Sequence, residues 1–321
     1  MHRRLQRQGT GNDRGHQQSR PPLLGAMNGI ELKVPIRLYW DVSPVPAVPL
    51  DYESICRDIL GLRILSINLT DLTPGVSEAA LSILVRLKGQ GTAVALTVGP
   101  ETITGEVLDR LAQLGVRTVL VRVEDIGELP EIPEKRPGTP ALGISFEVTA
   151  RNWRQLPPLV RYCSDNGIDL LAFPMQRLHE KGQSFYLSPL EKSELAALLK
   201  REPVPASLRL TIHDPFLWKI FFPQVSFPDG GCQAANTMVY ISADGAVTPC
   251  PSLPVTIGRL DTASFREIVR SEEKKRIRNE ILPLPTPCFG CAEASSCKGG
   301  CRGRAYVEQG SLDAADPGCL S

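Results

Sequence analysis

Residues 288–301 read Cys-Phe-Gly-Cys-Ala-Glu-Ala-Ser-Ser-Cys-Lys-Gly-Gly-Cys, so four cysteines follow one another with the spacing C-x2-C-x5-C-x3-C. Three further cysteines flank this block: Cys232 and Cys250 before it and Cys319 after it. The chain has nine cysteines in 321 residues, and seven of them lie after residue 230. Thiols gathered in this way indicate disulfides, zinc sites or iron–sulfur clusters. The carboxyl-terminal third therefore carries the chemistry of this chain.

These three kinds of site differ in what they require of the sequence. Disulfides need an oxidising compartment, yet the basic start of the chain is not followed by the apolar core of an export signal, and seven cysteines do not pair evenly. Zinc ribbons repeat the C-x2-C half-site, whereas the second half here has spacings of five and three. Soft thiolates suit zinc and iron–sulfur clusters alike. The spacing favours clusters, and a zinc-stabilised binding module stays open as an alternative.

The complete pattern from Cys232 to Cys319 reads C-x12-G-x4-C, gap, C-x2-C-x5-C-x3-C, gap, C. Within it, residues 238–241 (MVYI) lead into Asp244-Gly245 as the first strand of a hairpin would. Cysteine for cysteine, this segment resembles the SPASM domain that is attached to radical S-adenosylmethionine (SAM) peptide-modifying enzymes. The resemblance implies two auxiliary [4Fe–4S] clusters.

The resemblance also assigns ligands by position. The first cluster would be held by Cys232, Cys250 and Cys301. The second would be held by Cys288, Cys291, Cys297 and Cys319. Because Cys301 lies among the ligands of the other cluster, both sites would belong to one small folded unit, to which the metal–thiolate bonds contribute folding free energy.

The first cluster lacks one cysteine that many members of this family carry, and Ser226 stands at that position. Three protein groups are candidates for the missing ligand: Asp229, His213 and Asp214. A water molecule, or an iron left open to a substrate group, is equally compatible.

Upstream of the cysteines, strand and helix signals alternate. Short apolar runs rich in branched side chains predict strands at residues 34–40, 62–69, 93–98, 116–123, 141–148, 168–173 and 208–212. Helical faces lie between them, and Ser188-Pro189-Leu190-Glu191 predicts a capping box at a helix start. Repeated strand–helix units imply parallel strands with right-handed crossovers.

With the resemblance, this pattern predicts an α/β fold: a partial (β/α) barrel of radical SAM type followed by a small cysteine-rich SPASM domain. Residues 1–28 contain five arginines and one acid, and they predict a disordered basic tail. The expected domain boundaries are 29–225 for the degenerate radical SAM-like barrel and 226–321 for the SPASM iron–sulfur domain.

One motif of radical SAM enzymes is missing. The family places Cys-x3-Cys-x2-Cys just after the first barrel strand, whereas residues 36–40 run here into Asp41-Val42-Ser43-Pro44 without a cysteine. The resemblance therefore implies that SAM is not bound and that radical SAM catalysis is not expected. Cys56 and Cys163 stand alone on predicted helices, where a cysteine is a small buried apolar side chain.

A degenerate barrel with an intact SPASM end resembles the stand-alone SPASM-domain proteins of the GeoRSP system. The implied function is that of an accessory partner, in electron transfer or peptide binding, of a complete radical SAM/SPASM enzyme in peptide maturation. The implied partners are that enzyme and a peptide substrate or small peptide-binding protein. An enzyme that uses an open-site auxiliary cluster for its own substrate chemistry is the alternative.

Composition narrows the remaining possibilities. A net charge of +1 gives no general attraction to nucleic acid, and no apolar run approaches the roughly 20 residues of a membrane-spanning helix. We therefore expect neither nucleic acid nor membrane as a partner. Cluster thiolates must stay reduced, which predicts a cytoplasmic protein.

Charged residues near the cysteines have two interpretations. Lys298, Arg302 and Arg304 either offset the negative charge of the clusters and raise their reduction potentials, or are ordinary surface charge. The run Glu272-Glu273-Lys274-Lys275-Arg276 predicts a solvated helix face.

Overall fold

The computed structural model describes residues 31–42, 50–134, 136–227 and 231–319. The predicted basic tail of residues 1–28, the loop that begins at Ser43 and the candidate ligand Asp229 lie outside these ranges.

One ten-stranded sheet organises the molecule, in the order β10-β9-β8-β1-β2-β3-β4-β5-β6-β7. All pairs from β8 through β1 to β7 are parallel, and the β8–β9 and β9–β10 pairs are antiparallel. The strands are β1 (Arg37–Asp41), β2 (Ser66–Thr70), β3 (Ala93–Val98), β4 (Val116–Val123), β5 (Ala141–Phe146), β6 (Leu170–Phe173), β7 (Arg209–Ile212), β8 (Met238–Ile241), β9 (Ala246–Thr248) and β10 (Gly258–Arg259). The seven strands predicted from apolar runs are β1 to β7.

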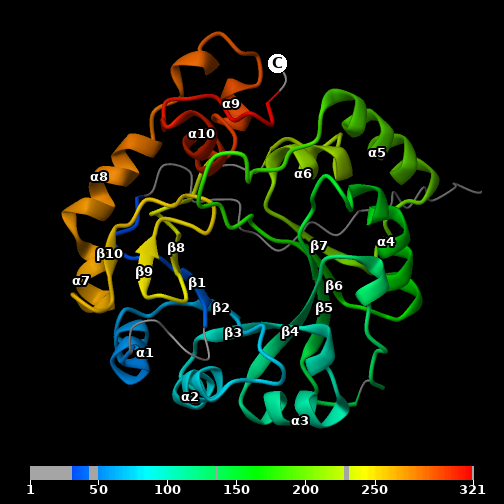
Figure 1. Ribbon diagram of the computed structural model, residues 1–321, viewed down its shortest axis with the longest axis vertical. Coiled ribbons are helices and arrows are strands. Elements are labelled where there is room, and N and C mark those ends of the chain that lie inside the picture. Colours follow the sequence, from blue (N-terminus) through cyan, green and yellow to red (C-terminus); the bar gives the residue numbers. More distant parts are fainter. Residues whose placement is uncertain (1–30, 43–49, 135, 228–230, 320–321) are drawn as a thin grey trace, which may run out of the picture.

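The sheet curves into an open arc, and Figure 1 looks down it with helices on its outer side. The carboxyl-terminal helices α9 and α10 lie where the arc is open (Figure 1). The helices are α1 (Tyr52–Gly61), α2 (Glu78–Leu87), α3 (Gly105–Gln113), α4 (Leu156–Asp165), α5 (Pro189–Arg201), α6 (Pro215–Phe221), α7 (Phe265–Arg270), α8 (Glu272–Ile281), α9 (Ala294–Cys297) and α10 (Arg302–Gln309).

Side chains alternate between the two faces of each strand, and this alternation separates core from cavity. In β3, Val94, Leu96 and Val98 are buried beneath the outer helices, while Ala95 and Thr97 face the inside of the arc. The outer face is thus aliphatic and forms the main core, and the inner face is partly polar. An arc whose two faces differ in this way can enclose a site.

Local signals in the sequence begin the helices as expected. The Ser188 hydroxyl accepts the Glu191 N–H, and the Glu191 carboxylate accepts the Ser188 N–H, so the predicted capping box at α5 is confirmed. Ser264 and Glu267 form a second capping box at α7. Cys56 on α1 and Cys163 on α4 are buried, as predicted, and burial raises the pKa of each thiol to about 12.

The cysteine-rich end is built onto the same sheet. β8 pairs with β1 and forms a hairpin with β9, which confirms the predicted hairpin. Outside the sheet, the Asp58 carboxylate on α1 accepts the Arg266 N–H of α7 at 2.9 Å and pairs with the Arg266 guanidinium. The two parts of the chain are therefore joined by backbone pairing and by side chains.

The charged run on α8 is not wholly a solvated face. Lys274 is buried, and its Nζ donates to the carbonyl oxygens of Leu32 and Lys33 at 3.1 and 3.4 Å. The prediction was wrong for this residue because its partners lie more than two hundred positions away in the sequence. Among the described residues, no helix is both long enough and apolar enough to cross a membrane.

Candidate metal centre

The seven carboxyl-terminal cysteines lie on turns and helix ends around the open side of the arc. Cys232 precedes β8 and Cys250 follows β9, while Cys288 ends a short 3-10 helix (Thr286–Cys288). Cys297 ends α9 and Cys301 is the N-cap residue of α10. Among the residues that the structure describes, no disulfide joins any of the seven. Turns and helix ends let a short segment direct several sulfurs toward a common centre.

Cys232, Cys250 and Cys301, which we call the first thiol set, lie within electrostatic range of one another. Burial raises the pKa of Cys250 well above its ordinary value, and the charges of Cys232 and Cys301 raise it further. Burial also raises the pKa of Cys301 to about 12, with Cys232 again contributing. The fold thus brings together residues that are up to 69 positions apart in the sequence (301 minus 232).

Cys288, Cys291, Cys297 and Cys319 form a second thiol set. Burial raises the pKa of Cys288, and the charges of Cys319 and Cys291 add to the effect. Burial likewise raises the pKa of Cys297, with Cys319 contributing. These electrostatic links join members of one set, and the assignment of each set to a cluster stays a prediction.

The surroundings of these sulfurs suit a metal cluster. Thiols that repel one another as thiolates stay protonated until a cation replaces their protons. Backbone N–H groups act in the other direction: those of Gly299 and Gly300 lower the pKa of Cys297, and those of Ser252 and Leu253 lower that of Cys250. Hydrogen bonds to sulfur of this kind are among the factors that set the potentials of iron–sulfur clusters.

Within the described ranges, no three His, Cys, Asp or Glu side chains converge closely enough to hold a single metal ion. A [4Fe–4S] cluster is larger than one ion, and its cysteine sulfurs stand farther apart. The finding therefore concerns sites for a single metal ion and not sites for a cluster.

Asp316 links the segments that carry Cys301 and Cys319 through hydrogen bonds. Its carboxylate accepts the N–H of Cys301 at 2.6 Å and that of Gly318 at 2.9 Å, and its carbonyl oxygen accepts the N–H of Cys319 at 2.8 Å. Asp316 is buried. One residue of each thiol set is thus held by the same aspartate.

Arg304 connects Asp316 to the barrel. Its Nε and Nη2 each lie 2.9 Å from an oxygen of Asp316, and its Nη1 pairs with Asp214. Asp214 also accepts the N–H groups of Phe216 and Leu217, so it caps α6 as well. The interpretation of Arg304 as surface charge was wrong, since 3% of the residue is exposed.

Arg302 is also buried, with 1% exposed, whereas Lys298 is exposed. The Arg302 Nη2 donates to the carbonyl oxygen of Ile281 at 2.9 Å and to that of Pro283. Its Nε and Nη1 are buried and have no hydrogen-bond partner among the residues that the structure describes. The sequence hint was the placement of the two arginines one and three positions after Cys301, which does not by itself distinguish burial from exposure.

The inner face of the arc encloses a cavity of about 260 Å³. Hydroxyl and amide side chains from successive strands line it, among them Asn68, Thr97, Thr118 and Ser145. His213 also lines this cavity, and burial lowers its pKa to about 4, so it is neutral at pH 7. The wall thus combines neutral hydrogen-bonding side chains with a larger apolar surface, and Arg122 and Arg177 add positive charge.

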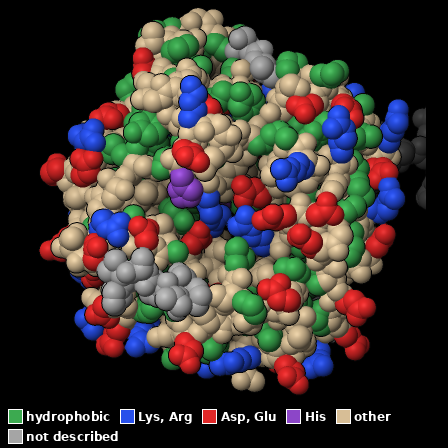
Figure 2. Space-filling view, viewed as in Figure 1, with side chains coloured by type: hydrophobic (Ala, Val, Ile, Leu, Met, Phe, Trp, Pro, Cys, Tyr) green, Lys and Arg blue, Asp and Glu red, His purple; other side chains and the backbone are tan. Residues whose placement is uncertain are grey.

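A charged network closes one side of this cavity. The Arg177 guanidinium pairs with both oxygens of Asp41 at 2.5 and 2.6 Å, and the Tyr240 hydroxyl donates to Asp41 at 2.8 Å. Figure 2 shows basic and acidic side chains gathered at the centre of the face that looks into the arc. Sequence reasoning missed this network, whose members come from β1, β8 and the segment after β6.

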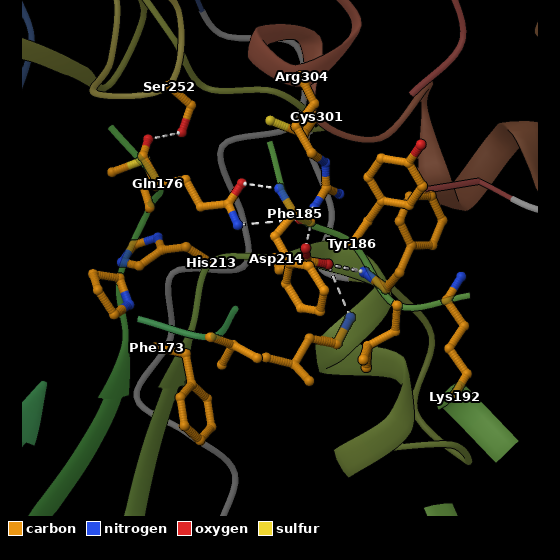
Figure 3. Close-up of a pocket in the computed structure, with 16 residues that line it drawn as sticks. Phe173, Gln176, Phe185, Tyr186, Lys192, His213, Asp214, Ser252, Cys301 and Arg304 are labelled. Carbon is orange, nitrogen blue, oxygen red and sulfur yellow. Dashed lines mark hydrogen bonds and ion pairs between the residues drawn. The ribbon is translucent and has the colours of Figure 1, made fainter. Parts of the chain in front are cut away.

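A smaller cavity of about 60 Å³ lies between the barrel and the thiol segments. Figure 3 shows Arg304 directed toward Asp214, with Cys301 beside Arg304. On the same wall, the Ser252 hydroxyl donates to the carbonyl oxygen of Gln176 at 2.6 Å. This cavity and the larger one share Pro174, Met175 and His213, so the first thiol set lies close to the barrel interior.

The candidates for a fourth ligand of the first set are placed differently. Ser226 is exposed, and Asp214 is engaged by Arg304 and by α6. His213 lies with its ring edge-on to Tyr39, 6.0 Å between ring centroids. Asp229 lies outside the described residues.

Comparison with protein families identifies the carboxyl-terminal segment. Residues 232–292 match the family model named SPASM, an iron–sulfur cluster-binding domain. The match contains four of the seven cysteines, and Cys297, Cys301 and Cys319 lie beyond it. This chain therefore carries an iron–sulfur-binding SPASM domain.

Curated relatives match either a short or a long part of the chain. The AdoMet-dependent heme synthase of Methanosarcina barkeri is 33% identical over 90 residues, which are 28% of this chain and 26% of that protein. The pre-heme d1 synthase of Dinoroseobacter shibae is 21% identical over 307 residues, 82% of this chain and 76% of that protein. The alignment to the first relative thus spans about a quarter of its length.

Among solved structures, SuiB of Streptococcus suis is similar with a TM-score of 0.63 and 16% sequence identity, over 91% of this chain and 78% of that one. SuiB has also been solved bound to S-adenosylmethionine and bound to its precursor peptide SuiA. At this identity the likeness shows the fold alone. The predicted fold class, a partial barrel of radical SAM type followed by a SPASM domain, is confirmed.

Proposed function

We propose that this chain is an accessory iron–sulfur protein that works beside a complete radical SAM/SPASM enzyme in peptide maturation. In this proposal the first thiol set and the second thiol set each hold one [4Fe–4S] cluster. The SPASM domain begins near residue 226, and the barrel before it does not use SAM. The role of the protein is to relay electrons or to hold the peptide that the partner enzyme modifies, in the cytoplasm.

The observation that supports the proposal is the electrostatic proximity of the cysteines within each thiol set, combined with a first strand that no cysteine motif follows. The two cysteines before residue 230, Cys56 and Cys163, are buried on outer helices and are far too isolated to form a third set. When bound, [4Fe–4S] clusters exchange single electrons. The residues of this chain shield the thiols and donate N–H groups to them.

A second candidate function has its own supporting observation. The first thiol set has three cysteines, and Cys301 borders the small cavity that shares walls with the barrel interior. An iron with an open position there would face a cavity whose wall is mainly apolar, with the charged side chains of Lys192, Asp214 and Arg304 among its lining residues. This arrangement favours a substrate group that binds the first cluster directly, so that the chain performs chemistry of its own.

Metal content after anaerobic reconstitution tests the cluster assignment. We expect about eight irons and eight sulfides per chain for two [4Fe–4S] clusters. Cys301→Ala is expected to lower the count to about four, because it removes a ligand of the first set only. The matched control is Cys163→Ala, which removes a buried cysteine of α4 and should keep all the iron.

Three other results would contradict parts of the proposal. Two zinc ions and no iron would establish the zinc-stabilised module instead. Equal iron loss from Cys301→Ala and Cys288→Ala variants, down to none, would contradict separate sets. If candidate peptides perturb the electron paramagnetic resonance (EPR) signal of the first cluster and are converted without a partner enzyme, the second function replaces the first.

A further inference from the structure

Arg302 has a guanidinium group that the protein itself leaves partly unpaired. The residue is buried at the first position of α10, directly after Cys301. Its Nη2 is satisfied by two carbonyl oxygens, but Nε and Nη1 find no acceptor among the described residues. A buried charged donor that has no hydrogen-bond partner is destabilising. The Arg302 guanidinium therefore needs a hydrogen-bond acceptor that the described polypeptide does not supply.

The surroundings indicate where this acceptor lies. Arg302 directly follows Cys301, and its Nη2 donates to the carbonyl oxygens of Ile281 and Pro283, in the segment that leads to Cys288, so the guanidinium lies between segments that carry cysteines of both thiol sets. A Cβ at Gly299 would lie 2.7 Å from the Pro285 ring and 3.3 Å from the Arg302 Nη1, so the backbone between Cys297 and Cys301 packs beside that nitrogen. The acceptor must therefore be anionic and lie beside the cysteines.

We propose that Arg302 contacts the iron–sulfur clusters, with its free N–H groups donating hydrogen bonds to cluster sulfur and its positive charge lying between the two thiol sets. The inference rests on the proposed assignment of two clusters. Cysteinyl and inorganic sulfide sulfurs are the anionic acceptors that the assignment places beside this residue. Arg302 thereby belongs to both sites.

A fixed positive charge has a defined effect on a cluster. Adding an electron makes the cluster more negative, so a nearby cation stabilises the reduced state and raises the reduction potential. Hydrogen bonds to sulfur act in the same direction. Because one guanidinium serves both sets, both potentials depend on it.

The test uses the full chain, reconstituted anaerobically, with potentiometric EPR titration of both clusters. In Arg302→Gln, we expect the iron content to stay at the wild-type level and both midpoint potentials to fall by at least about 59 mV, a tenfold change for a one-electron couple. Arg302→Lys keeps the charge and should recover part of the shift. The matched control is Lys298→Gln, which removes an equally adjacent but exposed charge and should leave both potentials nearly unchanged.

The outcomes separate this inference from the function on which it rests. Full iron content with unchanged potentials in Arg302→Gln overturns the role of Arg302 and leaves the clusters in place. Iron-free wild-type protein overturns the cluster assignment itself.

If Arg302→Gln does not retain iron, pulsed EPR on wild-type protein decides the question. In protein produced with arginine whose guanidinium carries 15N, the 14N coupling to the reduced clusters should be replaced by a 15N coupling. The Arg302→Lys variant should lack this arginine coupling. Wild-type protein without any arginine nitrogen coupling contradicts the inference.

Discussion

At the scale of single residues, buried arginines define the cysteine-rich end. Arg304 is surrounded by Asp214 and Asp316, and together they join the barrel to the segments that carry Cys301 and Cys319. Desolvating such charges is costly, so the network is stable only while every member keeps its partners. Removing the central cation should therefore be far more damaging than removing an exposed one.

We predict that Arg304→Gln lowers the free energy of unfolding by about 3–5 kcal/mol, because it leaves two carboxylates without their shared cation. The control is Arg276→Gln, whose guanidinium pairs with Glu273 and Glu280 on the exposed side of α8 and should cost less than about 1 kcal/mol. Urea denaturation of anaerobic protein measures both values. Similar losses in the two variants would contradict the structural role of Arg304.

At the scale of elements, α10 packs tightly against the turn after β9. A Cβ atom at Gly303 would lie 2.3 Å from the carbonyl oxygen of Ser252. Ser252 follows Cys250, and Gly303 follows Cys301, so this contact sets how closely two members of the first thiol set approach. Position 303 therefore requires a glycine, because any side chain there would clash with the backbone of Ser252.

We predict that Gly303→Ala reduces the iron content by about four per chain, since the methyl group would push α10 away from the turn that carries Cys250. Gly105→Ala is the matched control, because a Cβ there meets its nearest neighbour, the Arg136 guanidinium, at an ordinary 3.5 Å. Iron analysis and thermal unfolding compare the two. Full iron content in Gly303→Ala would show that the contact does not govern the first set.

At the scale of the whole molecule, the barrel and the cysteine-rich end share one sheet. β8 pairs with β1 along four residues, and Asp58, Arg266 and Lys274 add contacts between the two parts outside the sheet. Parts that are joined by a continuous hydrogen-bond ladder are expected to unfold together.

We predict a single thermal transition for the reconstituted protein, with loss of visible cluster absorbance and loss of barrel ellipticity at the same temperature. Removing iron with a chelator should lower that temperature for the barrel as well, because ligand binding to the folded state stabilises everything that unfolds with it. Two separate transitions would contradict this coupling. So would a barrel melting temperature that is the same with and without the metal.

Sequence patterns predicted the strands well, because branched aliphatic runs such as residues 93–98 and 116–123 reflect local burial beneath helices. The capping box at Ser188 is equally local. The ionic networks could not be predicted, since Asp41 and Arg177 are separated by 136 positions and Asp214 and Arg304 by 90. Pairings between residues so far apart in the sequence depend on the curvature of the whole sheet, which no local pattern describes. The division of the cysteines into two sets came from the family resemblance and stays a prediction.

The pairing of β1 with β8 has a consequence for how the chain is made. Arg37 at the start of β1 aligns with Met238 of β8, so the partner emerges from the ribosome about 200 residues later. At roughly 5–20 residues per second, that delay is on the order of 10–40 s. Throughout this interval one edge of β1 is an open template for pairing with other nascent chains. Translation speed and chaperone supply should therefore govern the yield of this protein as strongly as the availability of iron.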